Sequence, residues 1–240
     1  MYKGKALIEK INDFLYKPFF FSNIKKEEGV LALHLLIFFI LCFALVAVFT
    51  DEDKFYIAGS LLMLIFGSIL ITLNIKKLDS IGFTKDKFKM TLVILIIMIA
   101  LSLALNIEQI KNNEFTLYDF SFNATFYLII VGFLEELIFR GYLWPRLVVL
   151  FGNHKGTLLC GVAFGLMHLI SAYVYGNTPV NWLNTVNTIW EGVVGQYIFL
   201  FLYSFAKNIF FPSVIHASPH FFTVVRTPNE ALAAFQSLFS

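Results

Sequence analysis

The sequence predicts an all-α protein that crosses a membrane several times as one helical bundle. Of its 240 residues, 58% are hydrophobic and only 14% are charged, whereas about a quarter of the residues in soluble domains are charged. The hydrophobic residues also gather in long runs such as 30–49 and 182–203. Each of these runs can span the ~30 Å hydrocarbon core of a bilayer as a helix. We therefore expect seven to eight membrane helices, with no separate soluble domain.

Residues 1–28 are expected to form a cytoplasmic, interfacial amphipathic segment. Lysines at positions 3, 5, 10, 17, 25 and 26 are mixed with large apolar side chains such as Leu7, Ile11 and Phe14. This mixture is typical of a helix that lies on the surface of an anionic leaflet. The N-terminal segment is thus predicted to lie on the membrane and not to span it.

Seven apolar segments follow, at 30–49, 55–75, 90–107, 120–139, 156–175, 182–203 and 209–225. Each is long enough to be a candidate membrane helix, although the last is short. An eighth helix could lie in 141–151 or in a split of 182–211. We expect N-terminal transmembrane helices in 29–119, a membrane core in 120–228 and a C-terminal tail in 229–240.

The charges of the loops predict the orientation in the membrane. The loop at 76–89 contains five lysines, whereas the loops at 50–54 and 108–119 are mainly acidic. Basic loops face the cytoplasm, so the N-terminus is predicted to be cytoplasmic, in a cell inner (plasma) membrane. The net charge of +2 is too small to indicate a nucleic-acid partner. The bilayer itself is the expected partner, and the oligomeric state is left open.

Two adjacent glutamates, Glu135 and Glu136, lie near the end of the fourth apolar segment, and Arg140 follows them. Ionisable groups inside a membrane are costly unless they are paired, and they mark functional sites. Residues i and i+4 share a helix face, so we expect an ion pair between Glu136 and Arg140. Glu135 then points elsewhere and is free for chemistry. In the simpler alternative, both glutamates only hold Arg140 in place.

A histidine, His168, lies in the fifth apolar segment on the same helical stripe as Gly161, Phe164 and Gly165. The spacing of the two glycines allows another helix to approach closely. Phe164, one turn before His168, can pack beside the imidazole ring. By itself, such a histidine is most simply an interhelical hydrogen-bonding group.

The last apolar segment carries His216 and His220. Pro212 suits the first turn of a helix, which places His216 one turn further on. His220 shares the face of His216, but Pro219 removes a backbone hydrogen bond and disturbs the helix. The two histidines have the i, i+4 spacing of a metal-binding pair but lack the His-Glu-x-x-His signature.

A further polar stripe consists of Asn184, Asn187 and Glu191. Asparagines between membrane helices commonly hold the helices together by hydrogen bonds. We therefore interpret the stripe as a polar packing seam. The alternative is the polar path of a small transporter.

The carboxylate and imidazole groups together indicate hydrolytic chemistry. Peptide hydrolysis needs an activated water and a group that stabilises the developing oxyanion. A partly desolvated Glu135 suits the role of general base, while His168 and His216 could hold the water or donate to the intermediate. Alternatively, all three could bind Zn²⁺ with an open fourth position. The residues leave both mechanisms open, and no other cofactor is expected.

Three motifs in this order resemble the CAAX protease and bacteriocin-processing family, also called CPBP or Abi: Glu135-Glu136-x-x-x-Arg140, Phe164-x-x-x-His168 and His216-x-x-x-His220. The resemblance covers about residues 120–225. Its relatives include the Ras-converting-enzyme type of CAAX prenyl protease. It implies a helical intramembrane endopeptidase acting on a membrane-associated peptide or protein near the cytoplasmic face.

The resemblance also implies roles for individual residues. Glu135 would be the catalytic glutamate, supported by Glu136 and Arg140, and His168 and His216 would complete the site. The family commonly has asparagine at the position of His220, and histidine is bulkier and titrates. This departure motivates the alternative function, a catalytically impaired immunity or scaffold protein that binds a partner or toxin peptide.

Overall fold

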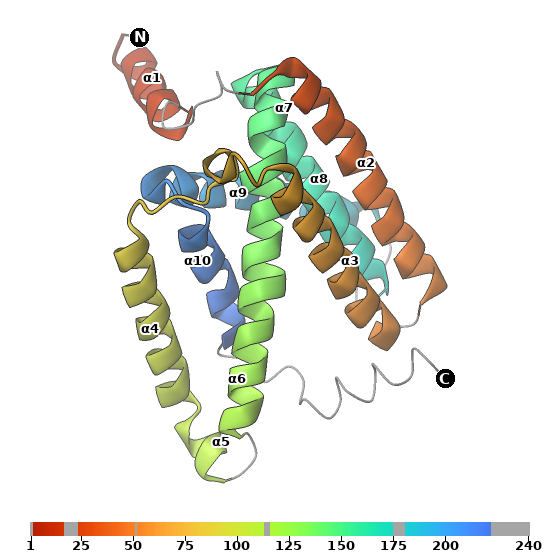
Figure 1. The fold of residues 1–240 in the computed structure, drawn as a ribbon, viewed down its shortest axis with the longest axis vertical. Coiled ribbons are helices and arrows are strands. Elements are labelled where there is room, and N and C mark those ends of the chain that lie inside the picture. The colour runs from red at the N-terminus through yellow and green to blue at the C-terminus, as the bar shows by residue number, and fades with distance from the viewer. Residues whose placement is uncertain (1, 17–23, 51, 113–115, 175–180, 222–240) are drawn as a thin grey trace.

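The computed structural model describes residues 2–16, 24–50, 52–112, 116–174 and 181–221 (Figure 1). Within these ranges every regular element is a helix, so the predicted all-α class is confirmed. In chain order the elements are α1 (Tyr2–Tyr16), α2 (Lys26–Phe49), α3 (Glu52–Leu73), the 3₁₀-helix η2 (Leu78–Ile81), α4 (Phe88–Leu105), α5 (Ile107–Lys111), α6 (Leu117–Phe126), the π-helices η3 (Tyr127–Leu134) and η4 (Leu137–Leu143), α7 (Trp144–Phe151), α8 (Asn153–Val174), α9 (Trp182–Ala206) and α10 (Phe210–Phe221).

Four helices in the described part of the chain are long and apolar enough to cross a membrane: α2, α4, α9 and residues Asn153–Tyr173 of α8. The apolar part of α3, Ile57–Leu73, is shorter, and α10 has 12 residues. The chain is therefore a membrane protein, while the count of seven to eight membrane helices stays a prediction. The candidate eighth helix within 141–151 corresponds to α7, which continues the line of η4 (Figure 1).

A continuous helical column formed by α6, η3, η4 and α7 runs through the middle of the bundle (Figure 1). Helices α2 and α3 pack on one side of it, α10 packs against η3, and α4 packs on α10. Every residue from 134 to 148 is buried, as expected for a helix that is surrounded by others. Two π-helical segments flank Glu135 and Glu136, and such wider turns are frequent at functional sites.

Helices α8 and α9 lie in close contact through glycines. A side chain at Gly165 of α8 would begin 2.7 Å from the Cα of Ile189, and one at Gly161 would begin 2.8 Å from the Cα of Val193. On α9, Gly192 faces this stripe. The predicted close approach along Gly161 and Gly165 is therefore confirmed, and it brings α9 against the helix that carries His168.

Helix α1 lies at the end of the bundle that also holds α7 (Figure 1). The Ser204 hydroxyl donates to the Leu15 carbonyl oxygen at 2.9 Å, and the hydroxyls of Tyr16 and Thr157 lie 3.2 Å apart. Leu7 and other apolar residues of α1 remain exposed, which suits the predicted interfacial position. Residues 1 and 17–23 of the predicted segment 1–28 lie outside the described residues, and its last three residues belong to α2. The end of the last predicted apolar segment, 222–225, and the predicted tail, 229–240, also lie outside the described residues.

Replacing Gly165 by leucine is expected to separate α8 from α9, because no space exists for the added atoms. Overpacking of this kind costs ~1–3 kcal/mol, so the midpoint of thermal unfolding in detergent should fall. Gly195→Ala on α9 is the matched control, since an added Cβ there would meet its nearest atom at an ordinary 3.9 Å. Equal unfolding midpoints for Gly165→Leu and Gly195→Ala would contradict the packing described.

Candidate active site

The two glutamates lie at the junction of η3 and η4, in the middle of the central column. Glu135 is 7% exposed and Glu136 is fully buried. Adjacent residues of a helix point ~100° apart, so the two carboxylates meet different neighbours.

Glu136 is the centre of a buried polar network. Its Oε1 accepts a hydrogen bond from Arg140 Nη1 at 3.1 Å, and both side chains of this pair are fully buried. The same oxygen lies 2.9 Å from His216 Nδ1. The predicted ion pair with Arg140 is thus confirmed. The bond to His216 was not predicted, and it links α10 to the central column.

Two aromatic rings enclose the Arg140 guanidinium. Its Cζ lies 4.2 Å from the ring centroid of Phe164 on α8 and 5.1 Å from that of Phe199 on α9. Aromatic faces attract a cation, most strongly when it is desolvated. The rings therefore stabilise a charged arginine where water is excluded.

His216 is oriented by Glu136 and faces Glu135. A carboxylate accepts hydrogen bonds, so His216 Nδ1 carries the proton and donates to Glu136. Its other nitrogen, Nε2, lies 3.7 Å from Glu135 Oε2, and the side chain is 13% exposed. The ring of Phe199 packs against the imidazole, with centroids 4.5 Å apart.

His168 approaches Glu135 from the opposite helix, α8. Its Nδ1 lies 2.9 Å from the Phe164 carbonyl oxygen, which can only accept, so Nδ1 donates there. The ring packs on Phe164 with centroids 4.4 Å apart, as the sequence predicted. Its Nε2 lies 3.9 Å from Glu135 Oε2, and 43% of the side chain is exposed. The site is therefore open on the His168 side.

Glu135 Oε2 thus faces the Nε2 atoms of two histidines from two other helices, at 3.9 and 3.7 Å. These distances are too long for direct hydrogen bonds, and Oε2 makes none with the described protein atoms. Polar groups at such separations are commonly bridged by water. The arrangement can hold a water molecule between a carboxylate and an imidazole.

The predicted zinc ligands are Glu135, His168 and His216. Across the described ranges, no group of three or more His, Cys, Asp or Glu side chains has an arrangement that could hold a metal ion.

The last histidine, His220, lies one turn after His216, because α10 continues through Pro219 to Phe221. Its ring stacks on Tyr127 of η3, with centroids 4.3 Å apart and planes 4° apart. This stacking attaches the end of α10 to the same column that carries the glutamates.

The predicted polar seam on α9 is wrong for Asn187 and Glu191, since both are exposed. The face of α9 that contacts α8 carries Gly192 and Gln196 instead. Gln196 is fully buried, and neither of its amide atoms has a hydrogen-bond partner among the described residues. Gln196 and Phe199 were missed by the sequence reasoning, although the i+4 spacing from Gly192 to Gln196 could have indicated the buried face.

Residues 118–222 match the family model described as type II CAAX prenyl endopeptidase Rce1-like. The matched stretch is somewhat less than half of the chain, and it contains all three motifs. The predicted resemblance is therefore confirmed for this domain. No curated protein and no solved structure matches the chain significantly.

Replacing Arg140 by methionine is expected to destabilise the protein by ~3–5 kcal/mol, because it leaves the Glu136 carboxylate buried without its cation. The double variant Arg140→Met/Glu136→Gln should recover part of the lost stability, because it no longer buries an unpaired carboxylate. Unfolding by denaturant in detergent measures both effects. Lys111→Met removes an exposed pair with Glu108 and serves as the control, with an expected loss below ~1 kcal/mol. An Arg140→Met loss no larger than that of Lys111→Met would show that the buried pair is not needed.

Proposed function

We propose that this chain, whose residues 118–222 form an Rce1-like domain, is an intramembrane endopeptidase of the CAAX type. The substrate would be a membrane-associated peptide or protein. One observation carries the proposal: Glu135 Oε2 faces the Nε2 atoms of His168 and His216 at 3.9 and 3.7 Å. The family match supports the same reaction class.

In the proposed reaction, Glu135 acts as general base. Its Oε2 takes a proton from a water molecule while the water oxygen forms a bond to the carbonyl carbon of the substrate. The carbonyl electron pair moves onto its oxygen. The oxyanion then re-forms the C=O bond as the C–N bond breaks, and the leaving nitrogen takes the proton from Glu135, which leaves a carboxylic acid and an amine. General base catalysis of this type contributes typically ~10²–10⁴-fold to the rate.

The histidines are proposed to stabilise the oxyanion. In its protonated form, His216 would donate from Nε2 to the oxyanion while Glu136 holds the Nδ1 proton. Protonated His168, on α8, would also donate from its Nε2 to the oxyanion, while its Nδ1 donates to the Phe164 carbonyl oxygen. Arg140 positions Glu136 and so acts through it. We place His220 as a further donor to the intermediate, in the position where the family has asparagine.

The basic loops support a cytoplasmic N-terminus and an inner-membrane location for the proposed protease. The catalytic core would comprise residues 120–228. Since His168 is the more exposed of the two histidines, the substrate is proposed to enter on the α8 side from the bilayer.

Glu135→Gln removes the base but preserves the shape of the side chain. We expect cleavage of a peptide library by the purified protein in detergent to fall by ~10²–10⁴-fold, with a similar loss for His168→Ala. Glu191→Gln changes an exposed glutamate on α9 and should leave turnover unchanged.

Equal turnover by the wild type, Glu135→Gln and His168→Ala would overturn the proposal. Specific binding of a peptide without its cleavage, retained in Glu135→Gln, would instead support the immunity or scaffold function.

If the water is activated by Glu135 without a metal ion, turnover should survive dialysis against a chelator. Elemental analysis of the same active sample should then find less than one zinc per chain. Loss of activity on chelation, with recovery on adding Zn²⁺, would assign the reaction to the three-ligand zinc alternative.

A further inference from the structure

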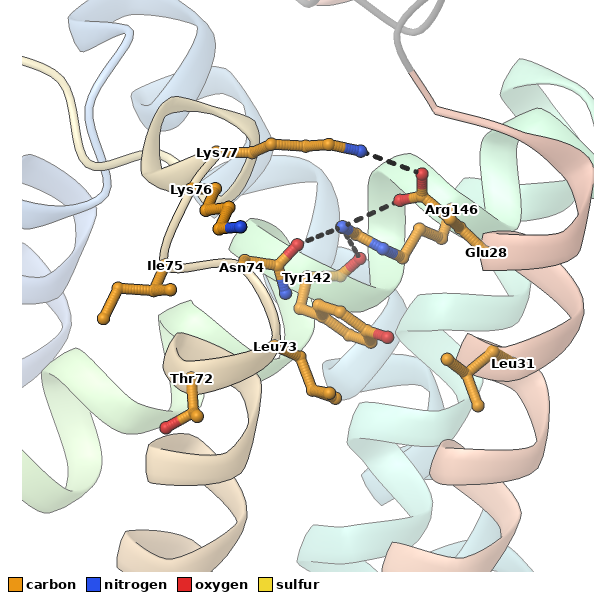
Figure 2. A pocket seen from close by; sticks show the side chains of 10 residues that line it. All are labelled: Glu28, Leu31, Thr72, Leu73, Asn74, Ile75, Lys76, Lys77, Tyr142 and Arg146. Atoms are coloured by element: carbon orange, nitrogen blue, oxygen red, sulfur yellow. Dashed lines mark hydrogen bonds and ion pairs between the residues drawn. The ribbon is translucent and has the colours of Figure 1, made fainter.

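A second polar site lies away from the catalytic centre, where the start of α2, the end of α3 and the η4–α7 junction meet (Figure 2). It is a cavity of about 360 Å³, and its polar lining includes Glu28, Asn74, Lys76, Lys77, Tyr142 and Arg146. None of these residues belongs to the proposed reaction. Glu28 and the two lysines lie in the segments that the sequence assigns to the cytoplasmic side.

A buried arginine forms one wall of this pocket. Arg146 is 1% exposed, and its Nη2 donates to Asn74 Oδ1 at 2.8 Å and to Glu28 Oε2 at 3.4 Å. Its Nη1 donates to the Tyr142 carbonyl oxygen at 3.1 Å, while its Nε has no hydrogen-bond partner in the described structure. The charge of Glu28 offsets part of the cost of burying the guanidinium. A further anion nearby would stabilise this cation in the same way.

The two lysines add unbalanced positive charge. Lys77 Nζ lies 3.3 Å from Glu28 Oε1, so one carboxylate serves both Lys77 and Arg146. Lys76 forms no ion pair with the described residues, and its side chain points into the pocket (Figure 2). Three cations therefore share a single anion, which leaves a net charge of about +2 in the pocket.

An apolar groove along α3 borders the pocket. Thr72 and Leu73 line both cavities. The groove has a volume of about 450 Å³, and its remaining lining is formed by Leu64, Ile65, Ser68 and Ile69. A cationic pocket at the end of α3 thus borders an open apolar groove that follows the same helix.

We propose that the pocket and the neighbouring groove together bind one anionic phospholipid. The headgroup phosphate would lie between Lys76, Lys77 and Arg146, and an acyl chain would follow α3. Charge complementarity selects the phosphate, since basic residues near a membrane surface attract anionic lipids. The apolar groove beside the pocket, which shares Thr72 and Leu73 with it, selects a lipid over a free phosphate ion, which has no chain to place there.

The test uses the full chain in a neutral detergent, titrated with short-chain phosphatidylglycerol, short-chain phosphatidylcholine or inorganic phosphate. Binding is measured by native mass spectrometry and by the shift in thermal unfolding. Phosphatidylglycerol should bind more tightly than phosphatidylcholine. Each lysine near the membrane surface contributes about fivefold to the affinity for an anionic lipid. The double variant Lys76→Gln/Lys77→Gln should therefore bind phosphatidylglycerol ~25-fold more weakly. Lys85→Gln/Lys89→Gln removes the same charge from exposed positions outside the pocket and should have little effect.

Ser68→Phe tests the acyl chain, because it fills the groove without changing the headgroup pocket. It should weaken phosphatidylglycerol binding and leave any phosphate binding unchanged. Equal affinity for the two phospholipids, or equal losses in the two double-lysine variants, would overturn the proposal. Phosphate binding as tight as that of the lipid, with no effect of Ser68→Phe, would show a site for free phosphate and would also overturn it. None of these measurements depends on peptidase activity.

Discussion

The Glu136 carboxylate is the group on which the arrangement of the site depends. It is fully buried and binds Arg140 and His216 through one oxygen. An ion in such surroundings is destabilised by several kcal/mol unless its partners restore what water would supply. Arg140 comes from the same helical column, and His216 comes from α10. This requirement for partners therefore links α10 to the middle of the bundle and fixes the position of His216 along it.

The position of Glu136 also explains why Oε2 of Glu135 has no hydrogen-bond partner among the described residues. Because adjacent helical residues point in different directions, one glutamate is neutralised by the network while the other faces the two Nε2 atoms. The glycines of α8 and α9 contribute from the other side. Their small size lets the helices approach, and Phe164 then lies against Arg140 while it also holds the His168 ring. Packing and electrostatics thus act on the same few side chains.

The central column carries two buried arginines with different surroundings. Arg140 is enclosed by protein, between a carboxylate and two aromatic rings. Arg146 lies about two turns further on and shares Glu28 with a lysine at the edge of a pocket. The first cation organises the candidate active site. The second lies in a pocket with more positive than negative charge, which is why we assign it to the binding of an anionic lipid.

The sequence by itself determined the all-α class, the membrane character, the Glu136–Arg140 pair, the close approach at Gly161 and Gly165, and the family resemblance. These follow from composition and from the 3.6-residue period of a helix, which are local properties. Only the tertiary structure decided that His216 binds Glu136, that Gln196 is buried and that Glu191 is exposed. Those outcomes depend on the rotation of each helix about its axis and on its height relative to its neighbours. Both are set by contacts between segments far apart in the chain. On α9, Gly192 packs against α8, and this rotation leaves Asn187 and Glu191 on the exposed face.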